Sequence, residues 1–315
     1  MNSVLVGIGA ALPKKCVTNF DLPADLDTSD EWISTRTGIK QRYIAEEETT
    51  ASLATEAAHQ ALEQAKILPE EVDLIIVGTV TGDYTFPSTA TIVQKNLRAK
   101  GVAFDVSAAC SGFVYALSIA DSFIKTGKAK CALIIGAETF SRIVDWKDRS
   151  SCVLFGDGAG AAVLRAEENT DCGVKYCKIS SDGAYADHLI TSGGVSTTQT
   201  AGFVTMQGRE VFKFAVEKFY ESVNELLREN NMTIDDVDLI VPHQANFRII
   251  KKLAEMLQID ESKVLVTIDK HANTSAASIP LALSEVKDTI FKKKNIVLIS
   301  MGAGFTWGSA LIKLQ

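Results

Sequence analysis

Residues 72–78 read Val-Asp-Leu-Ile-Ile-Val-Gly and residues 237–243 read Val-Asp-Leu-Ile-Val-Pro-His, so one apolar run occurs twice at an offset of 237 − 72 = 165. A helical pattern of apolar residues precedes each run, over 51–66 and over 210–228. Continuous Val, Leu and Ile residues are typical of strands that are buried on both faces. The two stretches therefore predict two α/β units of similar construction.

Two further pairs of segments keep nearly the same offset. Residues 132–136 match residues 297–301, with 298 − 133 = 165. Residues 104–110 match residues 268–274, with 269 − 105 = 164, and we expect both to be strands that end in a turn. A constant register over three separated segments indicates an internal duplication, and equivalent strand ends then meet near a pseudo-twofold axis.

The chain has 315 residues, of which 46% are hydrophobic, and this is enough for a large core. We place the two halves at residues 1–170 and 171–315. Residues 192–202 are rich in Ser, Thr and Gly, so we expect a loop or the linker between the halves there.

Charge and cysteine content exclude several classes of protein. A net charge of −7 argues against nucleic acid as the main partner. The six cysteines form no CxxC pair, and none of the four histidines has metal-site spacing to a cysteine, so we expect a reduced, cytoplasmic protein without a metal. The apolar run 4–12 is too short to cross a membrane, and we expect it to be a strand.

Cys110 stands where a predicted buried strand over 102–106 passes into a predicted helix that begins at Ser111. The N-terminus of a helix favours a thiolate, which is the nucleophilic form of cysteine. The alternative interpretation is a small buried hydrophobic residue, which is the usual role of a cysteine.

Three later segments also follow predicted strands or precede helices. His243 comes directly after a buried strand, and its alternative role is that of a hydrogen-bonded structural histidine. Residues 271–278 form a run of small polar residues that could belong to an active site, and the alternative role of this run is a helix N-cap with tight packing. Residues 301–308 form a Gly-rich turn that either only reverses the chain or directs N–H groups at an oxyanion.

The Gly-rich loop 155–160 is followed by a predicted strand and not by a helix, which excludes a dinucleotide-binding fingerprint there.

Taken together, these segments resemble the thiolase-like condensing enzymes, and most closely the β-ketoacyl-acyl-carrier-protein synthase III family. The matching blocks follow one another in family order along nearly the whole chain: 30–39, 104–113, 155–162, 242–246, 273–278 and 302–309. The resemblance implies a five-layered α-β-α-β-α fold that is built from two duplicated halves, and a homodimer.

The resemblance also implies a catalytic triad of Cys110, His243 and Asn273. Cys110 takes a short acyl group from acyl-CoA, for which we expect acetyl-CoA in this chain, and malonyl-acyl carrier protein then enters and loses CO₂. His243 and Asn273 hydrogen-bond the thioester oxygen of the enolate, whose carbanion attacks the acyl carbon. The backbone N–H groups of Cys110 and Ala303 hold the other oxyanion, and Ala303 replaces the middle of three glycines found in many relatives. No cofactor is implied.

Binding residues are carried over from the same family. The CoA-binding positions are Trp32, Arg36, Arg149 and Gly208. The acyl-pocket positions are Phe86, which the partner subunit lends, and Phe140, Phe155, Leu189 and Met206. The positions that face the carrier protein are Lys213, Gln244, Arg248, Lys251 and Lys252, for which a solvated surface is the alternative.

Phe140 stands where some relatives have leucine, so we expect a smaller pocket that favours a short primer such as acetyl. Two other functions remain open from the sequence. One is a condensing enzyme of secondary metabolism, of the alkylquinolone or polyketide type. The other is a cysteine acyl-thioesterase, which would need a general base beside the thiol and a path for water.

Overall fold

Two mixed β-sheets form two layers of the structure, a computed structural model that describes residues 1–314. The first sheet has the strand order β1-β7-β6-β4-β5, in which β4 runs parallel to β5 and β6 and β7 runs antiparallel to β6 and β1. Its strands are β1 (Asn2–Ala11), β4 (Leu74–Gly78), β5 (Val102–Val106), β6 (Cys131–Glu138) and β7 (Gly158–Glu167). The predicted strand over 4–12 is therefore confirmed.

The second sheet has the order β11-β12-β13-β8, with β11 parallel to β12 and antiparallel pairing elsewhere. Its strands are β8 (Gly173–Ser181), β11 (Leu239–Pro242), β12 (Asn295–Gly302) and β13 (Thr306–Lys313). Two further antiparallel pairs of strands lie outside these sheets, β2 (Lys15–Thr18) with β3 (Gln41–Ile44) and β9 (Leu189–Thr191) with β10 (Val204–Met206).

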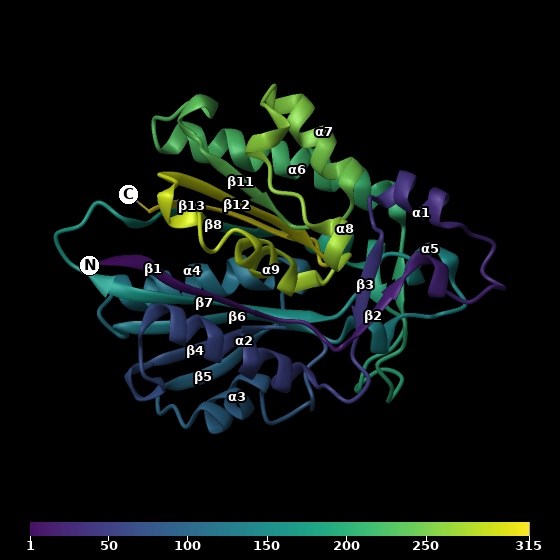
Figure 1. The fold of residues 1–315 in the computed structure, drawn as a ribbon, viewed down its shortest axis with the longest axis horizontal. Coiled ribbons are helices and arrows are strands. Elements are labelled where there is room, and N and C mark those ends of the chain that lie inside the picture. Colours follow the sequence, from purple (N-terminus) through teal and green to yellow (C-terminus); the bar gives the residue numbers. More distant parts are fainter. Residues whose placement is uncertain (315) are drawn as a thin grey trace.

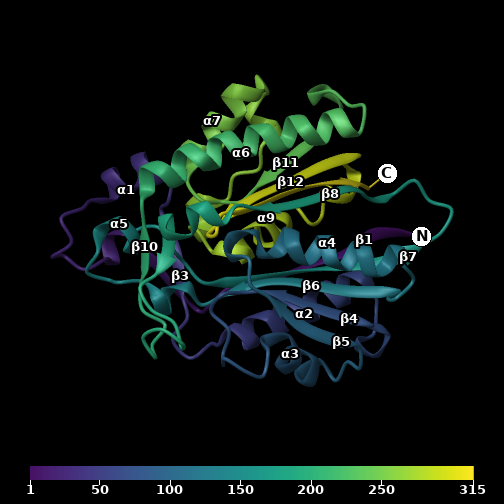
Figure 2. The same ribbon diagram turned by 180° about the vertical axis from the view of Figure 1, so that it is seen from behind.

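Helices fill the space between the sheets and cover both outer faces, which completes five α-β-α-β-α layers (Figures 1 and 2). One outer layer holds α2 (Thr50–Ala65) and α3 (Thr89–Leu97), the central layer α4 (Gly112–Lys125) and α9 (Ser278–Glu285), and the other outer layer α6 (Gly208–Glu229) and α7 (Phe247–Leu257). The short helices are α1 (Asp30–Thr37), α5 (Arg149–Cys152) and α8 (Ile268–His271).

Short 3-10 turns complete the secondary structure. They are η1 (Asn19–Asp21), η2 (Pro69–Glu71), η3 (Ala109–Ser111), η4 (Phe140–Ile143), η5 (Gly183–His188), η6 (Ile234–Asp236), η7 (Glu261–Lys263), η8 (Ser275–Ala277) and η9 (Ile290–Lys292).

The central strands are apolar throughout because helices cover both of their faces. In β4, Ile76 packs into the central core with α4, whereas Ile75 packs on the opposite face against α2 and α3. In β12, Leu298 enters the same central core and Val297 packs under α6 and α7. Alternate side chains of one strand thus enter different cores, which explains the uninterrupted apolar runs.

The strand pairing agrees with the duplication but shifts one of the matched segments by one residue. Ile75 pairs with Leu133 in the first sheet, and Ile240 pairs with Val297 in the second, so that 240 − 75 = 165 and 297 − 133 = 164. Leu133 therefore corresponds to Val297, which also faces an outer helix layer, and the sequence match of Leu133 with Leu298 is wrong by one position. Each half then turns through a short 3-10 segment into a central helix: η3 leads into α4, and η8 leads into α9. The two central helices lie side by side between the sheets (Figure 1).

One of the three matched pairs is wrong. Residues 268–271 form the short helix α8 instead of a strand. In the first half β4 pairs with the edge strand β5. At the corresponding edge of the second sheet, β11 makes a single parallel bridge, between Ile240 and Val264. The match rested on a shared apolar-Asp pair at residues 104–105 and 268–269, and so short a match does not determine which backbone groups pair.

The stretch 192–202 forms a loop, but the prediction that it links the halves is wrong. It closes the hairpin of β9 and β10, and β8 has already joined the second sheet before it. The division at residues 170 and 171 remains a proposal. The strand over 102–106 is also less buried than predicted, because β5 lies at the edge of its sheet and Val102 is 58% exposed.

Among residues 1–314, no helix combines the length and apolar character needed to cross a membrane. The same residues contain no cluster of three or more His, Cys, Asp or Glu side chains arranged to hold a metal ion.

Candidate active site

Cys110 lies in the tight turn η3, directly before α4 and close to the end of β12. The turn is closed by a hydrogen bond from Ser111 N–H to Ala108 O at 3.0 Å, and Ala109 adopts φ = 45°. The Ser111 hydroxyl also donates to Thr306 O at 3.0 Å. The strand-to-helix junction predicted at Cys110 is therefore present, with the 3-10 turn inserted before the helix.

A glycine is required where β12 ends against this turn. A Cβ atom on Gly302 would lie 2.7 Å from the backbone N of Cys110, which is too close for any side chain. The Thr306 hydroxyl lies 3.0 Å from Ala108 O and 3.1 Å from Ala303 O, so it ties the two turns together. The turn that carries Ala303 therefore lies next to Cys110, as a shared oxyanion site requires. The role of Ala303 as a donor stays a prediction.

The thiol of Cys110 is almost completely buried. Burial raises its pKa to about 12, and an interaction with the Ser275 side chain opposes this shift. Burial and the start of α4 therefore act on the thiol in opposite directions, and the expectation that the helix start favours the thiolate stays a prediction. A thiol in this position needs a proton acceptor before it attacks a substrate.

His243 follows β11 directly and lies in the same buried region. Its backbone N–H donates to Ile299 O at 2.8 Å, and its Nδ1 lies 2.6 Å from the Ser278 hydroxyl oxygen. Burial lowers the pKa of His243 to about 3, so the imidazole is neutral at physiological pH. A neutral imidazole donates one hydrogen bond and is a weak base, which suits stabilisation of an enolate better than removal of a proton.

Asn273 is held by the backbone of the loop before β7. Its N–H donates to Leu154 O at 3.0 Å, and its own carbonyl accepts from Gly156 N–H at 3.0 Å. The side-chain oxygen accepts from Ser275 N–H at 2.9 Å. Since the amide oxygen is engaged, the amide nitrogen is the atom through which Asn273 can donate to a ligand. The loop over 155–160 thus positions a candidate catalytic residue.

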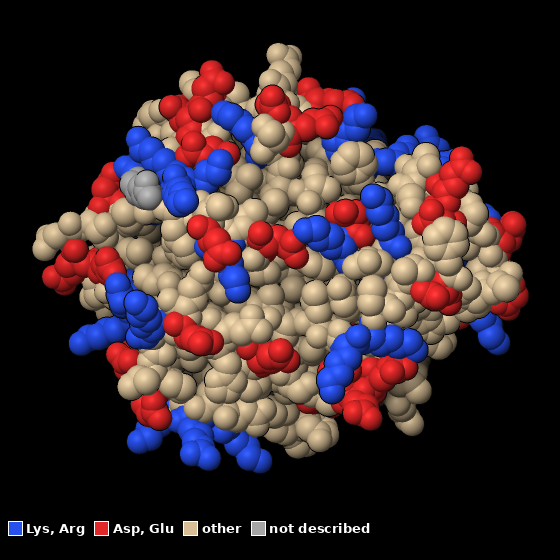
Figure 3. Space-filling model, viewed as in Figure 1, with Lys and Arg blue, Asp and Glu red and all other residues tan. Residues whose placement is uncertain are grey.

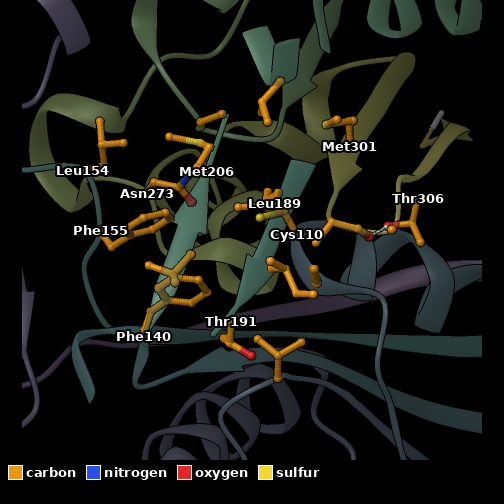
Figure 4. Close-up of a pocket in the computed structure, with 18 of the residues that line it drawn as sticks. Cys110, Phe140, Leu154, Phe155, Leu189, Thr191, Met206, Asn273, Met301 and Thr306 are labelled. Carbon is orange, nitrogen blue, oxygen red and sulfur yellow. Dashed lines mark hydrogen bonds between the residues drawn. The ribbon is translucent and has the colours of Figure 1, made fainter. Parts of the chain in front are cut away.

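Cys110, His243 and Asn273 line one cavity of about 720 Å³. Four predicted acyl-pocket residues line it as well: Phe140, Phe155, Leu189 and Met206. Figure 4 shows these side chains with Cys110 and Asn273 around the cavity. The cavity is mainly apolar, with the polar triad at one part of its wall, and this is the usual construction of a small-molecule site.

Two aromatic residues form one wall of the cavity. The rings of Phe140 and Phe155 are stacked with their centroids 4.3 Å apart. Phe86 is absent from this chain's own cavity wall and is 83% exposed. Its predicted role in a second subunit's pocket is consistent with this exposure and stays a prediction.

Two of the predicted CoA-binding residues, Trp32 and Arg149, contact each other at the surface. The Arg149 guanidinium lies over the Trp32 ring at 5.1 Å from its centroid, and it also pairs with Asp27 at 3.2 Å. Arg36 is exposed at the end of α1, and Gly208, the first residue of α6, lines the cavity.

Four predicted carrier-protein contacts are exposed on two neighbouring helices: Lys213 on α6, and Arg248, Lys251 and Lys252 on α7. Basic side chains gather where α7 and α1 meet on the face seen in Figure 3, interspersed with acidic ones. Lys252 pairs with Glu255 at 3.1 Å, and the Arg248 guanidinium lies 5.6 Å from the Phe212 ring.

Gln244 does not reach this surface, so its predicted contact with the carrier protein is wrong. It is buried and donates to Pro242 O at 2.8 Å and to Leu265 O at 3.0 Å. Its side-chain oxygen accepts from Thr267 N–H at 2.8 Å. Gln244 instead holds the chain after β11 against the segment that leads to α8.

Comparison with known proteins identifies the family. Models of 3-oxoacyl-[acyl-carrier-protein] synthase III and of its C-terminal part match residues 104–183 and 227–314. The chain is 55% identical to the β-ketoacyl-[acyl-carrier-protein] synthase III of Rhodospirillum centenum, with 99% of each chain covered. The chain belongs to the 3-oxoacyl-[acyl-carrier-protein] synthase III family. Members of this family are acyl-transferring condensing enzymes with a thiolase fold.

Solved structures agree with this assignment. The synthase III of Aquifex aeolicus VF5 superimposes with a TM-score of 0.93 at 50% identity, with 99% of each chain covered. A priming β-ketosynthase from the R1128 polyketide pathway gives a TM-score of 0.91 at 33% identity, covering 99% of this chain and 96% of the other. The fold predicted from sequence is confirmed.

Three residues of the site were missed from sequence. Ser278 contacts His243, and Ser275 contacts both Asn273 and the buried Glu138. Ser275 and Ser278 lie within the matched block 273–278, which was the available signal for them. Glu138 ends an apolar strand and carried no local signal.

Proposed function

We propose that this chain starts type II fatty-acid synthesis by joining a short acyl group from acyl-CoA to malonyl-acyl carrier protein. The products are a 3-oxoacyl-carrier protein, CoA and CO₂. The observation that carries the proposal is that Cys110, His243 and Asn273 converge on one cavity.

In the first half-reaction the Cys110 sulfur attacks the carbonyl carbon of acyl-CoA. The new carbon–sulfur bond forms as the bond to the CoA sulfur breaks, and CoA leaves with the electron pair. The negative charge on the carbonyl oxygen is stabilised by the N–H groups of Cys110 and Ala303, which belong to adjoining turns. Fixed donors of this kind contribute mainly in the transition state.

In the second half-reaction malonyl-acyl carrier protein enters the cavity and loses CO₂. His243 and Asn273 each donate a hydrogen bond to its thioester oxygen as the enolate forms. The enolate carbon then attacks the acyl carbon on Cys110, and Cys110 leaves as the thiolate. Because His243 is neutral, it stabilises the enolate through its N–H and carries no charge that would attract the malonyl carboxylate.

For CoA binding we propose that Trp32 and Arg149 stack on the adenine, with Arg36 at a phosphate and Gly208 beside the pantetheine arm. The two stacking groups are 5.1 Å apart. An inserted base needs about 7 Å, twice the ~3.4 Å spacing of stacked bases. The proposal therefore requires Arg149 to leave Asp27 and move away from the ring when CoA binds.

The primer is proposed to be short, acetyl in the first instance, because Phe140 and Phe155 close one wall of the cavity. We further propose a homodimer in which Phe86 completes the pocket of the second subunit. Two features support it. Phe86 is 83% exposed, and β5 is an edge strand of its sheet that offers unpaired backbone groups to another strand.

The carrier protein is proposed to dock on Lys213, Arg248, Lys251 and Lys252, since an acidic carrier and its phosphopantetheine suit a basic surface. The chemistry needs no cofactor beyond the two substrates, and we place the protein in the cytoplasm.

The chain is more similar to synthase III enzymes, at 50–55% identity, than to the polyketide priming enzyme, at 33% identity. This difference favours fatty-acid synthesis over secondary metabolism.

Intact-mass analysis tests the function. We expect acetyl-CoA to add one acetyl group to the wild-type protein, and malonyl-acyl carrier protein to remove it as a condensed carrier product. Cys110→Ala should remain unmodified, whereas Cys16→Ala, which removes an exposed cysteine, should acylate normally. Acylation followed only by free acetate would overturn the proposal in favour of a thioesterase.

A further inference from the structure

Glu138, the last residue of β6, is fully buried beside the active site. It accepts hydrogen bonds from the Thr79 hydroxyl at 3.2 Å, from Val80 N–H at 3.2 Å, from the Ser275 hydroxyl at 3.1 Å and from the Thr81 hydroxyl. Every one of these partners is a donor, so the site is built for a carboxylate that only accepts. The chemistry proposed above has no role for this group.

The ionised carboxylate receives no help from a positive charge. Within residues 1–314, no lysine, arginine or histidine forms an ion pair with Glu138. Burial raises its pKa to about 7, and its hydrogen bonds oppose the shift. Three elements face the Glu138 carboxylate. The loop 79–81 contributes two hydroxyls and a backbone amide, and η8 contributes the Ser275 hydroxyl. The titratable group among its neighbours is the Cys110 thiol of η3, whose pKa the Glu138 charge raises.

Ser275 connects this carboxylate to the nucleophile. Its hydroxyl donates to Glu138 Oε1 at 3.1 Å, and its side chain also interacts with the Cys110 thiol in a way that lowers the pKa of that thiol. Its backbone adopts φ = 51°, a conformation that few residues other than glycine adopt. Strain of this kind is found where a side chain is held in place for function. The backbone of Ser275 also holds Asn273, so one residue contacts both parts of the site.

Cys110 needs such a connection because it must lose a proton before it attacks. Its pKa is about 12, and the other basic side chain of the triad, His243, has a pKa of about 3 and an Nδ1 that is bonded to Ser278. Direct transfer of the thiol proton from Cys110 to the His243 imidazole is therefore unfavourable. Glu138 is a stronger base than His243, and Ser275 interacts both with its carboxylate and with the thiol.

We propose that Glu138 takes the Cys110 proton through the Ser275 hydroxyl during acylation and returns it when Cys110 is released by condensation. This inference rests on the proposed function and assigns Glu138 and Ser275 as a proton relay for it.

The relay is balanced over the full cycle. In acylation, the Cys110 proton passes to Ser275 Oγ as the Ser275 hydroxyl proton passes to Glu138, and the thiolate forms the acyl–sulfur bond. CoA leaves as a thiolate and takes a proton from solvent. In condensation, the Cys110 thiolate leaves with the electron pair of its bond to the acyl carbon and recovers the proton from Glu138 through Ser275. One solvent proton is consumed per turnover, as loss of CO₂ from a malonyl carboxylate requires.

The test separates proton transfer from the second half-reaction by using Glu138→Gln and Ser275→Ala. One measurement is single-turnover acylation of Cys110 by acetyl-CoA, and another is alkylation of Cys110 by iodoacetamide, both followed by mass against pH. The third is decarboxylation of malonyl-acyl carrier protein by enzyme whose Cys110 is already alkylated. We expect both variants to lose about 100-fold or more in acylation and alkylation at pH 7, the usual contribution of a general base.

Decarboxylation should stay within about threefold of wild type in Glu138→Gln, which also verifies that this variant is folded. The wild-type acylation rate should rise with pH through an inflection near 7, where Glu138 ionises, and this inflection should be absent in Glu138→Gln. Glu138→Asp should restore part of the rate and the inflection, because it keeps a carboxylate.

Thr79→Val is the matched control, since it removes one hydrogen bond to the same carboxylate and leaves the path through Ser275 intact. It should retain most of the acylation rate and move the inflection to higher pH, because the carboxylate loses a donor. If Glu138 only anchors the loop 79–81, Thr79→Val would reduce acylation as much as Ser275→Ala, and the relay would be rejected. Alkylation needs no acyl-CoA, so unchanged alkylation in both variants would reject the relay while leaving the proposed function standing.

Discussion

The Ser278 hydroxyl oxygen lies 2.6 Å from Nδ1 of His243 and accepts the backbone N–H of Gln244 at 3.3 Å. Among residues 1–314 the Ser278 hydroxyl has no other acceptor within hydrogen-bond distance, so we expect it to donate its proton to Nδ1. The imidazole then carries its proton on Nε2, which is the tautomer that can donate to an enolate. Ser278 is therefore a positioning residue for the second half-reaction.

Ser278→Ala should slow condensation by about 10-fold to 100-fold, because a buried Nδ1 without a partner costs about 1–3 kcal/mol and the donor tautomer is no longer selected. Acylation by acetyl-CoA should change by less than about threefold. Ser284→Ala is the control on the same helix, since the Ser284 hydroxyl donates only to Leu281 O within α9. Equal losses in both half-reactions would indicate a packing defect instead.

His243→Ala should harm decarboxylation far more than acylation. The neutral imidazole contributes a hydrogen bond to the enolate, and removing one oxyanion donor costs about 100-fold to 1,000-fold in rate. Release of CO₂ from malonyl-acyl carrier protein measures the first effect, and the mass of acetylated Cys110 measures the second. A comparable loss in acylation would show that His243 also acts on the thiol, which would contradict the relay through Glu138.

Much of the fold follows from local sequence pattern. The runs at 74–77 and 239–241 are apolar because helices cover both faces of each sheet, and their repetition identified the duplication correctly. Exposure of the edge strand β5 was not apparent, because the sequence of Val102 to Val106 does not reveal the order of strands in the sheet. That order depends on the whole chain.

The active-site residues, too, could be predicted from sequence only in part. Cys110, His243 and Asn273 stand at strand ends or turns, where local sequence marks a change of structure. Glu138 was missed because its partners in the loop 79–81 and in η8 are far away in sequence, and only the packed structure brings them together. Gln244 was misplaced for a related reason, since burial of a polar side chain is a tertiary property.

Phe140→Leu should broaden primer use. The Phe140 ring packs face to face on Phe155 at 4.3 Å, so a smaller side chain opens space along the cavity wall. We expect kcat/KM for octanoyl-CoA relative to acetyl-CoA to rise by about 10-fold, within the range expected for a change of a few carbon atoms in an apolar pocket. Wild-type enzyme that already prefers octanoyl-CoA over acetyl- and isobutyryl-CoA would contradict the short-primer proposal.

His243 should also make the protein sensitive to acid. Its folded-state pKa is about 3, below the usual 6.5, so between these pH values the unfolded chain binds more protons and stability falls as pH decreases. The protein should lose about 2 kcal/mol of unfolding free energy from this group at pH 5, and His243→Asn should lack this loss. Urea unfolding from pH 7.5 to 4.5 measures it. His59→Asn, which changes an exposed histidine, should keep the wild-type slope.

Trp32→Ala should weaken recognition of the nucleotide part of CoA and leave the chemistry intact. Base stacking on an aromatic ring is worth about 1–3 kcal/mol, so KM for acetyl-CoA should rise by about 10-fold. Acetyl-N-acetylcysteamine has no adenine, and its kcat/KM should be unchanged. Arg149→Ala should behave similarly, whereas Arg165→Ala removes a comparably exposed arginine that pairs with Glu167 and should have no effect. An equal loss with both thioesters would mean that Trp32 and Arg149 support the fold of α1 and α5 instead of holding the nucleotide.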